Sequence, residues 1–501
     1  MIPLNELLNA MQKAKDFLFA QIEKGASKNQ DEIAPNLQKK VSLQHFDSSR
    51  FQKNIHIYSH LDADGLSAAA IMAKMFTREN IGFQITILNQ LESQYIATIA
   101  EEISKYNRFI VLTDFGSGQY EILKEKLKTT DFLILDHHKP EKIDNPPEIN
   151  HINPYFYDIR GEDEISGAGI CYLFSKIMNE KNQDLAALAI VGAIGDMQNN
   201  NDKSEFKGIN QKILQEAMND RKIILEKNIA ISRTRPLIQS LIYSLPLEIE
   251  GLSGSYDGVV QFLNRINIQA TDELNHSRTL IDLSEMEKKT LTNALIQYAL
   301  VEKGISTDDI KKLVTTFYIL TDFDPKISVS DAREMSSLLN ACGRRGKQGV
   351  GIAALLGNAE ALTDAMSEKK DYKKELSRAI QSAKKQIREY EYIRTVYDNT
   401  IDERIIGTIC SILIHSDLQH DKPLIAFADS DNHFLKVSSR ANRELLDKGL
   451  DLGIVMRKAC QQLKIQNPAG GHPPAAGAKI KTAHLKDFIE KVNEFVKEQI
   501  G

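Results

Sequence analysis

The chain has 501 residues, of which 42% are hydrophobic and 26% are charged, the composition of a globular protein with about two to four domains. Its formal net charge of −5 excludes a surface coated with basic residues, although a local basic groove for nucleic acid stays open. No apolar run approaches the roughly 18 residues of a membrane span, and four widely spaced cysteines without a Cys-x-x-Cys pair favour a reducing cytoplasm over a disulfide framework or a zinc site.

Residues 1–50 predict an amphipathic helix and a charged surface loop over Lys24–Glu32, and they carry no catalytic motif. From residue 54 onward, short apolar runs alternate with helical segments. This pattern is typical of a parallel, doubly wound sheet, whose ligands bind at the carboxyl ends of its strands. The predicted strands are Ile55–Ser59, Phe83–Leu88, Phe109–Thr113 and Phe132–Leu135, and the predicted helices are Ser67–Phe76 and Ile96–Tyr106.

The first predicted strand ends in three possible metal ligands, His60, Asp62 and Asp64, followed by Gly65 and an alanine-rich helix. Because alternate side chains leave a strand on the same side, we expect these three groups to lie together. Imidazole and carboxylate groups at a strand end indicate a metal site. An Asp-x-Asp-Gly sequence is about as common in a turn or a helix N-cap, so this motif alone does not decide between the two interpretations.

Two later strand ends carry further acids. Asp114 follows one predicted strand, and the triplet Asp136-His137-His138 follows the next. With 12 histidines in the chain, composition alone predicts roughly 0.3 adjacent His pairs. A His pair directly behind an Asp at a strand end therefore favours a functional site over a structural pair.

A fourth acid, Asp196, ends the apolar helical stretch Leu185–Gly195. A carboxylate at the end of a buried helix costs free energy unless it is paired or bound to metal, although a lone Asp can also end a helix at the surface. The combined ligands suffice for two divalent ions with one bridging carboxylate, an arrangement that can hold an attacking hydroxide and the phosphate oxygens of a phosphodiester. Mixed imidazole and carboxylate ligands favour Mn²⁺, with Mg²⁺ as the alternative. The six candidate ligands are His60, Asp62, Asp64, Asp114, His137 and Asp196.

Four motifs occur in order along the chain: His-Leu-Asp-Ala-Asp-Gly at 60–65, Thr-Asp-Phe-Gly-Ser-Gly at 113–118, Leu-Asp-His-His at 135–138 and Ile-Gly-Asp-Met-Gln at 194–198. Together they resemble the DHH phosphoesterase superfamily, which is named after the Asp-His-His triplet. Bacterial RecJ members usually have Asp at the position of His60. This departure resembles the archaeal branch and changes the type of ligand without removing one.

The resemblance implies a role for each of these residues. His60 and Asp62 are expected to bind one metal ion, and Asp114 is expected to bridge it to a second. The second ion is expected to be held by Asp64, His137 and Asp196. The resemblance also implies that His138 contacts the scissile phosphate and that Asp136 orients a ligand imidazole.

The middle of the chain, residues 202–330, is predicted to be mostly helical with a loop-rich centre. Its Arg233-Thr-Arg-Pro236 stretch resembles archaeal RecJ-like nucleases, and without the resemblance its arginines would be expected to be merely exposed. A glycine-spaced loop with Arg344, Arg345 and Lys347 follows, where guanidinium groups and backbone amides can approach a phosphate chain. A solvated turn is the alternative interpretation. Residues Glu368–Arg394, with nine basic and five acidic residues, predict a long connecting helix with a solvated face.

The last hundred or so residues predict a second, smaller α/β unit. A predicted strand ends in Ser438, Ser439 and Arg440, and a glycine-rich segment contains Gly470, Gly471 and His472. These residues resemble the DHHA1 domain, which implies that they grip a nucleotide or its phosphates. The expected fold class is therefore α/β, with a parallel-sheet DHH domain over residues 1–365, a connecting helix over 366–398 and a DHHA1 domain over 399–501.

The whole resemblance implies a metal-dependent exonuclease specific for single strands. It would act 5′ to 3′ on DNA, or also on RNA, in replication or repair, with the GINS complex of the replicative helicase as a partner and no membrane involved. Two alternatives stay open. A phosphodiesterase for short RNA or cyclic dinucleotides uses the same two domains, but the basic loop favours a longer substrate. The noncatalytic replication scaffold Cdc45 also resembles this family but has lost ligands, so the intact ligand set ranks that alternative lower.

Overall fold

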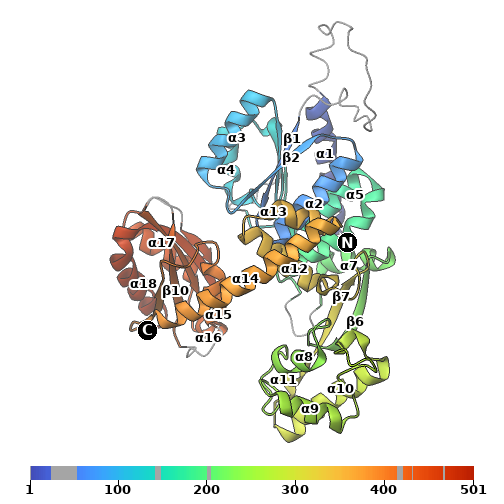
Figure 1. Cartoon of the computed structure of the whole chain (residues 1–501). Coiled ribbons are helices and arrows are strands. Elements are labelled where there is room, and N and C mark those ends of the chain that lie inside the picture. The colour runs from blue at the N-terminus through green and yellow to red at the C-terminus, as the bar shows by residue number, and fades with distance from the viewer. Residues whose placement is uncertain are drawn as a thin grey trace. The chain divides into compact units, whose positions relative to one another are not determined.

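The computed structural model describes residues 2–23, 54–140, 148–199, 205–414, 421–430, 433–465 and 469–501. The loop predicted over Lys24–Glu32 lies outside the described residues. The chain divides into two units, Met1–Glu368 and Lys369–Gly501, and each is described by itself (Figure 1). Among the described helices, none is both long enough and apolar enough to cross a membrane.

The first unit is built on a five-stranded sheet with the order β2-β1-β3-β4-β5, in which all neighbouring strands run parallel. Four of the strands lie where the sequence predicts them. The fifth has only two residues, too few to leave a periodic pattern in the sequence. The strands are β1 (Ile55–His60), β2 (Phe83–Leu88), β3 (Phe109–Thr113), β4 (Phe132–Leu135) and β5 (His151–Ile152).

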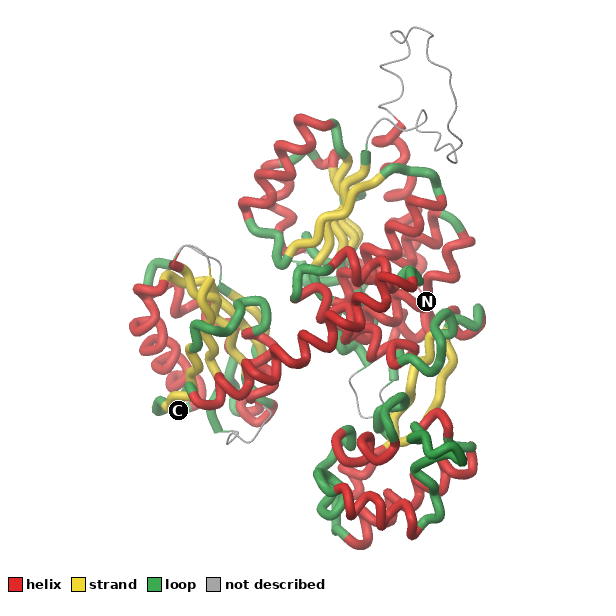
Figure 2. Tube along the Cα trace, viewed as in Figure 1, coloured by secondary structure: helices red, strands yellow, loops and turns green. Residues whose placement is uncertain are grey.

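Helices cover both faces of this sheet (Figures 1 and 2). Side chains alternate along β1: Ile55 and Ile57 belong to the larger core, whereas Tyr58 belongs to the core under α3 and α4. Because both faces are covered, the central strands β3 and β4 are buried at every position and are almost wholly apolar, as the sequence pattern indicates. The larger core contains α1 (Ile2–Glu23), α2 (Ala63–Arg78), α5 (Gly167–Met178), α6 (Ala186–Gly195) and α7 (Gly208–Asn219), and the other face is covered by α3 (Ser93–Tyr106) and α4 (Tyr120–Lys126).

The middle of the chain forms a helical insert with its own core, carried by an antiparallel pair of strands. The sequence predicts the helices but misses this pair, because burial along its first strand does not alternate. Arg233, expected to be exposed, is only 8% exposed, and its Nη2 donates to Glu226 Oε2 at 2.9 Å. The strands are β6 (Ile223–Ile229) and β7 (Val314–Leu320), and the helices between them are α8 (Leu237–Tyr243), α9 (Tyr256–Arg265), α10 (Glu285–Gln297) and α11 (Thr307–Ile310).

Three helices close the first unit and lead into the second: α12 (Ala332–Arg344), α13 (Gln348–Leu355) and α14 (Ala359–Lys385). The connecting helix predicted up to Arg394 is wrong at its end, because the chain turns after Lys385 into strands of the next sheet. The Arg394 side chain is only 4% exposed and pairs with Glu389 at 2.5 Å and Asp421 at 2.8 Å. Part of the charge that suggested a solvated helix therefore belongs to a buried arginine, which is paired with two partly exposed acids.

The second unit contains a six-stranded sheet with the order β12-β13-β11-β10-β9-β8. Neighbouring strands are antiparallel except for β9 and β10. Helices α17 and α18 share a core with one face of the sheet, and α15 packs against β10 and β11. The elements are β8 (Ile387–Glu389), β9 (Arg394–Tyr397), α15 (Ile406–Ile414), β10 (Leu424–Ser430), β11 (Phe434–Arg440), α16 (Arg443–Asp447), α17 (Leu452–Gln462), β12 (Gly470–His472), β13 (Ala475–Lys481) and α18 (Leu485–Ile500).

Candidate metal centre

The carboxyl ends of β1, β3 and β4 and the end of α6 gather the predicted ligands in one place. They form three overlapping groups, in each of which one ligand-type atom per residue lies within 4.8 Å of the others. Asp114 belongs to two of the groups, and so does His137. The groups are His60, Asp62 and Asp114; Asp64, His137 and Asp196; and Asp114, His137 and His138.

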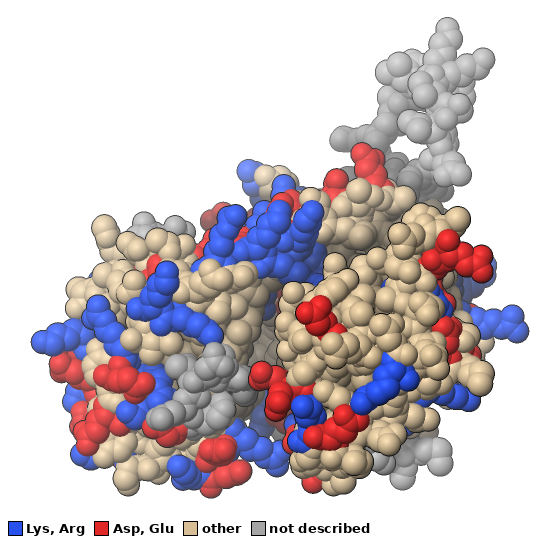
Figure 3. All heavy atoms as spheres, turned by 60° about the horizontal axis from the view of Figure 1, so that its bottom comes forward, with Lys and Arg blue, Asp and Glu red and all other residues tan. Residues whose placement is uncertain are grey.

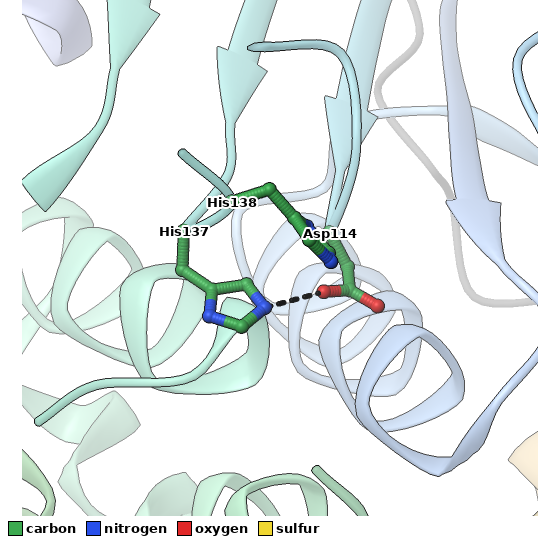
Figure 4. Close-up of side chains that lie close together, drawn as sticks. All are labelled: Asp114, His137 and His138. Atoms are coloured by element: carbon green, nitrogen blue, oxygen red, sulfur yellow. Dashed lines mark ion pairs between the residues drawn. The ribbon is translucent and has the colours of Figure 1, made fainter. Parts of the chain in front are cut away.

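Asp114 lies between two histidines. Its Oδ2 is 3.6 Å from His60 Nδ1. Its Oδ1 is 3.3 Å from His137 Nε2, the contact that Figure 4 marks with a dashed line. The residue follows β3 in a left-handed conformation, with φ of 61°, which is uncommon for a residue other than glycine and tends to occur at functional sites. Each carboxylate oxygen faces a different histidine, the arrangement that a carboxylate bridging two ions needs.

Four buried atoms at this point have no hydrogen-bond partner in the described part of the chain: both oxygens of Asp114, His60 Nδ1 and His137 Nε2. His60 Nδ1 is 2.8 Å from Asp62 Oδ2, but the contact is an ion pair without hydrogen-bond alignment. Leaving buried polar atoms unsatisfied is costly, and native structures rarely do so without a ligand or water. The donor set of imidazole nitrogen and carboxylate oxygen fits a divalent cation such as Mn²⁺.

The two acids of the first motif accept hydrogen bonds from the starts of two different helices. Asp62 is the N-cap of α2: its Oδ1 accepts from the Gly65 N–H at 3.0 Å while its Oδ2 faces His60. Asp64, in the first turn, accepts from the backbone N–H groups of Gly167 at 2.7 Å and Ala168 at 3.0 Å, at the N-terminus of α5. The N-cap and metal-ligand interpretations of this motif are therefore compatible.

His137 is fixed in one tautomer by the backbone. Its Nδ1 lies 2.7 Å from the Gly161 carbonyl oxygen, which can only accept, so Nδ1 carries the hydrogen. In the neutral ring, Nε2 then presents its lone pair toward Asp114, Asp64 and Asp196. A hydrogen bond of this kind on the far nitrogen is typical of a metal-binding histidine.

Both carboxylate oxygens of Asp136 accept hydrogen bonds from neighbouring groups. Its Oδ1 accepts from the His138 ring at 2.9 Å and from the backbone N–H groups of His137 and His138, and its Oδ2 accepts from the Ser117 N–H at 2.9 Å. Burial opposes its ionisation, but the His138 charge and these hydrogen bonds outweigh burial and hold the pKa of Asp136 well below its usual range. The His138 side chain is 51% exposed, although its Nδ1 is held by Asp136.

Asp196 ends α6 as its C-cap, 31% exposed, with Oδ2 3.7 Å from His137 Nε2. The C-terminal end of a helix carries partial negative charge and disfavours a carboxylate.

Burial, followed by the Asp114 charge, raises the pKa of Asp64 well above its ordinary value. Burial would lower the pKa of His137, but Asp196, Asp114 and Asp64 outweigh it and raise that pKa. Both pKa shifts show that this cluster of acids favours the binding of positive charge, either as protons or as a cation.

The predicted basic loop lies against the first metal-ligand motif. Gly343, near the end of α12, leaves no room for a side chain because its Cβ would collide with the Leu61 carbonyl oxygen. On the same helix, Asn340 Oδ1 accepts from the Ala63 N–H at 3.0 Å. Arg345 Nε donates to Glu368 at 2.6 Å, whereas Lys347 is exposed. The end of α12, which carries Arg344 and leads to Arg345 and Lys347, is therefore packed against residues 61–63 of the first motif.

The residues predicted to bind substrate in the second unit divide between the two faces of its sheet. The pairing register places Ser438, Arg440 and His472 on one face. Arg440 Nε donates to Ser411 Oγ at 2.8 Å, and a Cβ on Gly407 of α15 would touch its Nη2. Ser439 lies on the opposite face with Gly471 and donates to the Ala476 carbonyl at 2.9 Å. Gly470 pairs with Gly477 in the row that contains Ser438.

Sequence reasoning missed the groups that hold the ligands in place. They are Gly161, Gln198, Asn340, the Ser117 N–H, and the start of α5 at Gly167 and Ala168. Gln198 stands inside a quoted motif, and the Ser166-Gly167-Ala168-Gly169 run marks a tightly packed helix start. These two features can be recognised in the sequence. The remaining groups can be identified only when it is known which distant segments lie together.

Three family models match the chain: the DHH family, N-terminal domain over residues 54–193, the DHH-CID domain over 232–314 and the DHHA1 domain over 390–498. The uncharacterised protein MJ0831 of Methanocaldococcus jannaschii is 30% identical over 450 residues, which are 89% of this chain and 94% of that protein. The single-stranded-DNA-specific exonuclease RecJ of Haemophilus influenzae is 27% identical over 175 residues, 32% of this chain and 28% of RecJ.

Two solved structures share the fold. Exonuclease RecJ bound to manganese has a TM-score of 0.56 at 15% identity, covering 97% of this chain and 94% of RecJ. CDC45 from Entamoeba histolytica has a TM-score of 0.58 at 14% identity, covering 89% of this chain and 95% of CDC45. At such identities the likeness shows the fold alone. The predicted fold class, a parallel-sheet domain joined by a long helix to a smaller α/β domain, is confirmed.

Proposed function

The chain belongs to the DHH family, and on that premise we propose that it is a metal-dependent exonuclease that hydrolyses phosphodiester bonds in single-stranded nucleic acid. The observation that carries the proposal is the set of four buried ligand-type atoms around Asp114 that make no hydrogen bond to any residue the structure describes. They call for cations, and a phosphodiester would be repelled by the acids of this cluster unless cations were bound.

The proposed ligands divide as the motifs suggest. His60 and Asp62 hold one divalent ion, Asp64, His137 and Asp196 hold the other, and Asp114 bridges them. When bound, two such ions supply an activated water and neutralise charge on the phosphodiester. Mn²⁺ is the proposed preference and Mg²⁺ the alternative, because imidazole lies beside carboxylate in each group.

His138 is proposed to contact the scissile phosphate. Burial opposes protonation of its ring, but the neighbouring Asp136 outweighs burial and raises the pKa of His138. Asp136 holds Nδ1 at 2.9 Å, so Nε2 is the nitrogen that can donate to a phosphate oxygen. Asp136 thereby acts on the reaction by orienting His138.

A single strand is the proposed substrate, because the basic loop beside Leu61 adds contacts beyond the scissile phosphate. Arg344, Arg345 and Lys347 are proposed to contact its phosphates in the first unit. For the second unit, taken by itself, Arg440 and Ser438 are the proposed phosphate contacts. Over the face in Figure 3, Lys and Arg alternate with Asp and Glu, except for one dense cluster in which basic side chains predominate. The net charge of −5 alone argues against nucleic-acid binding, but a local cluster of basic side chains is compatible with it.

The proposal extends to 5′ to 3′ digestion of DNA, with RNA as a second substrate, and to a role in replication or repair with the GINS complex as partner. Its support is the family resemblance and the printed activity of the RecJ relative, a single-stranded-DNA-specific exonuclease. These points therefore need direct tests of their own.

The test uses single-stranded DNA and RNA oligonucleotides, labelled at either the 5′ or the 3′ end, with Mn²⁺. We expect the wild type to degrade them progressively and Asp114→Ala to be inactive, with Asp220→Ala, an exposed aspartate at the end of α7, as the matched control. Equal turnover by wild type and Asp114→Ala would refute the metal mechanism. Cleavage confined to dinucleotides would favour the short-RNA or cyclic-dinucleotide alternative. The order in which the 5′ and 3′ labels are released gives the direction of digestion.

A noncatalytic scaffold of the Cdc45 kind is the second candidate function, because the fold likeness to CDC45 covers most of both chains. The six proposed ligands are nevertheless all present and grouped. A wild-type protein that neither binds Mn²⁺ nor cleaves any oligonucleotide, while binding a replication partner, would favour the scaffold.

A further inference from the structure

Gln198 lies behind the metal centre and touches two parts of it at once. The residue is 4% exposed, and its side-chain amide nitrogen donates to Asp196 Oδ2 and to the Gly161 carbonyl, both at 2.8 Å. The Ile165 carbonyl lies 3.3 Å from the same nitrogen. Three oxygen acceptors around one atom identify it as the nitrogen of the amide, because an amide oxygen there would face three other oxygens.

The Gly161 carbonyl is also the group that orients His137, whose Nδ1 donates to it at 2.7 Å. One amide therefore links two candidate ligands of the same ion, Asp196 directly and His137 through a backbone carbonyl. The two ligands come from different segments, the end of α6 and the loop after β4. Without such a link, each ligand would be placed by its own segment alone.

The amide is itself oriented by Asn210 of α7, which is 1% exposed and whose Nδ2 donates to Gln198 Oε1 at 2.5 Å. This bond occupies the oxygen end of Gln198 and keeps the nitrogen end on Asp196 and Gly161. Asn210 is separated from the candidate ligands by Gln198, so its effect on them passes through that residue.

We propose that Gln198, oriented by Asn210, is a positioning residue that aligns Asp196 and His137 on one of the two metal ions. The inference rests on the proposed function, since it presumes that these side chains bind metal. Groups of this kind behind the ligands typically change metal affinity by about 10- to 100-fold when they are replaced. Gln198 contacts neither the ion nor the substrate in this role.

The experiment titrates metal-free, full-length protein with Mn²⁺ by calorimetry. Gln198→Met keeps the length of the side chain and removes both hydrogen-bonding ends, and Gln211→Met, exposed on α7, is the matched control. We expect wild type and Gln211→Met to bind two ions. In Gln198→Met one ion should bind about 10- to 100-fold more weakly, while the other binds as before. Electron paramagnetic resonance should then show an uncoupled single Mn²⁺ at concentrations where wild type shows a coupled pair.

A second variant keeps the test decisive if Gln198→Met does not fold. Asn210→Ala leaves Gln198 in place, and we expect a smaller loss at the same single ion, with thermal unfolding of the metal-free protein measured alongside. Two unchanged affinities in both variants would overturn the inference, as would an equal loss of both ions that follows a lower unfolding temperature. A wild type that binds no Mn²⁺ would instead refute the proposed function itself.

Discussion

Strand β1 carries two histidines in opposite surroundings. His56, 1% exposed, has partners at both ring nitrogens: Glu102 lies 2.7 Å from Nδ1 and Thr86 lies 2.8 Å from Nε2. Tyr58 and Arg108 also donate to Glu102, at 3.0 Å and 3.2 Å. His60, at the end of the same strand, faces Asp114, and neither its buried Nδ1 nor the Asp114 carboxylate forms a hydrogen bond within the described part of the chain.

The comparison distinguishes a charged cluster that stabilises the fold, around His56, from a candidate metal site, around His60 and Asp114. Both regions bury charged groups, but the first pairs them with hydrogen-bond partners of its own, whereas the second leaves four ligand-type atoms without a hydrogen bond to any described residue. A buried charge is therefore weak evidence for function. Unsatisfied atoms that face one point are stronger evidence, and the two clusters can be tested against each other by matched changes of carboxylate to amide.

The largest effect is expected from Asp114→Asn. The change keeps the shape of the bridge and removes its charge, so hydrolysis should fall on the order of 10³-fold, about 4 kcal/mol in the transition state. Mn²⁺ binding should weaken, yet the metal-free protein should be as stable as wild type or more stable, because repulsion with Asp64 is relieved. Single-turnover kinetics and urea unfolding measure the two quantities. A clear loss of stability with unchanged Mn²⁺ binding would make this cluster structural.

Metal should stabilise the wild type by mass action. At a Mn²⁺ concentration 100 times its Kd, the free energy of unfolding should rise by about 2.7 kcal/mol per site. EDTA should reverse the gain, and Asp114→Asn should show little of it. Urea unfolding with and without Mn²⁺ measures the difference, and an equal gain in both proteins would place the binding elsewhere.

The complementary change, Glu102→Gln, should act on stability alone. It removes the charge that His56, Tyr58 and Arg108 share, and loss of charged hydrogen bonds in a partly buried cluster should cost about 2 kcal/mol. Mn²⁺ affinity and turnover should stay at wild-type values. A variant with normal stability but impaired metal binding would remove the distinction between the two clusters.

The smallest effect is expected in the basic loop. Arg345 is paired with Glu368, whereas Lys347 is exposed and suited to a phosphate. Lys347→Ala should lower affinity for single-stranded DNA and reduce the slope of log K against log salt by about 1. Stability should change by less than about 0.5 kcal/mol. Fluorescence anisotropy at several salt concentrations measures the slope, and an unchanged slope would exclude Lys347 from the binding surface.

The sequence predicts the parts of this fold that depend on local pattern. Four strands of the first sheet are short, mostly apolar runs, and the acids that follow them are informative because parallel strands end at one edge. For the same reason the six proposed ligands could be named before their geometry was known, although their binding of metal stays a prediction. The two-residue β5 and the irregular β6 carry no periodic signal and are missed.

Features that depend on contacts between distant segments could not be predicted. Nothing near Asp64 indicates that its carboxylate sits at the start of α5, and nothing near Asn340 indicates that it holds Ala63. The composition of their segments suggests that Arg394 and Arg233 are solvated. Both side chains are instead buried, and both form ion pairs. Composition reports what a segment contains, whereas burial depends on what packs against it.

Two glycines at the metal centre have a consequence for how such sequences diverge. A Cβ on Gly167 would collide with Asp114, and one on Gly192 would collide with Asp64. A single methyl group at either position would push a proposed ligand aside while every acid and histidine remained in the alignment. A descendant could therefore lose its chemistry with its signature intact, and anyone surveying relatives for active members should inspect positions 167 and 192 as closely as the acids.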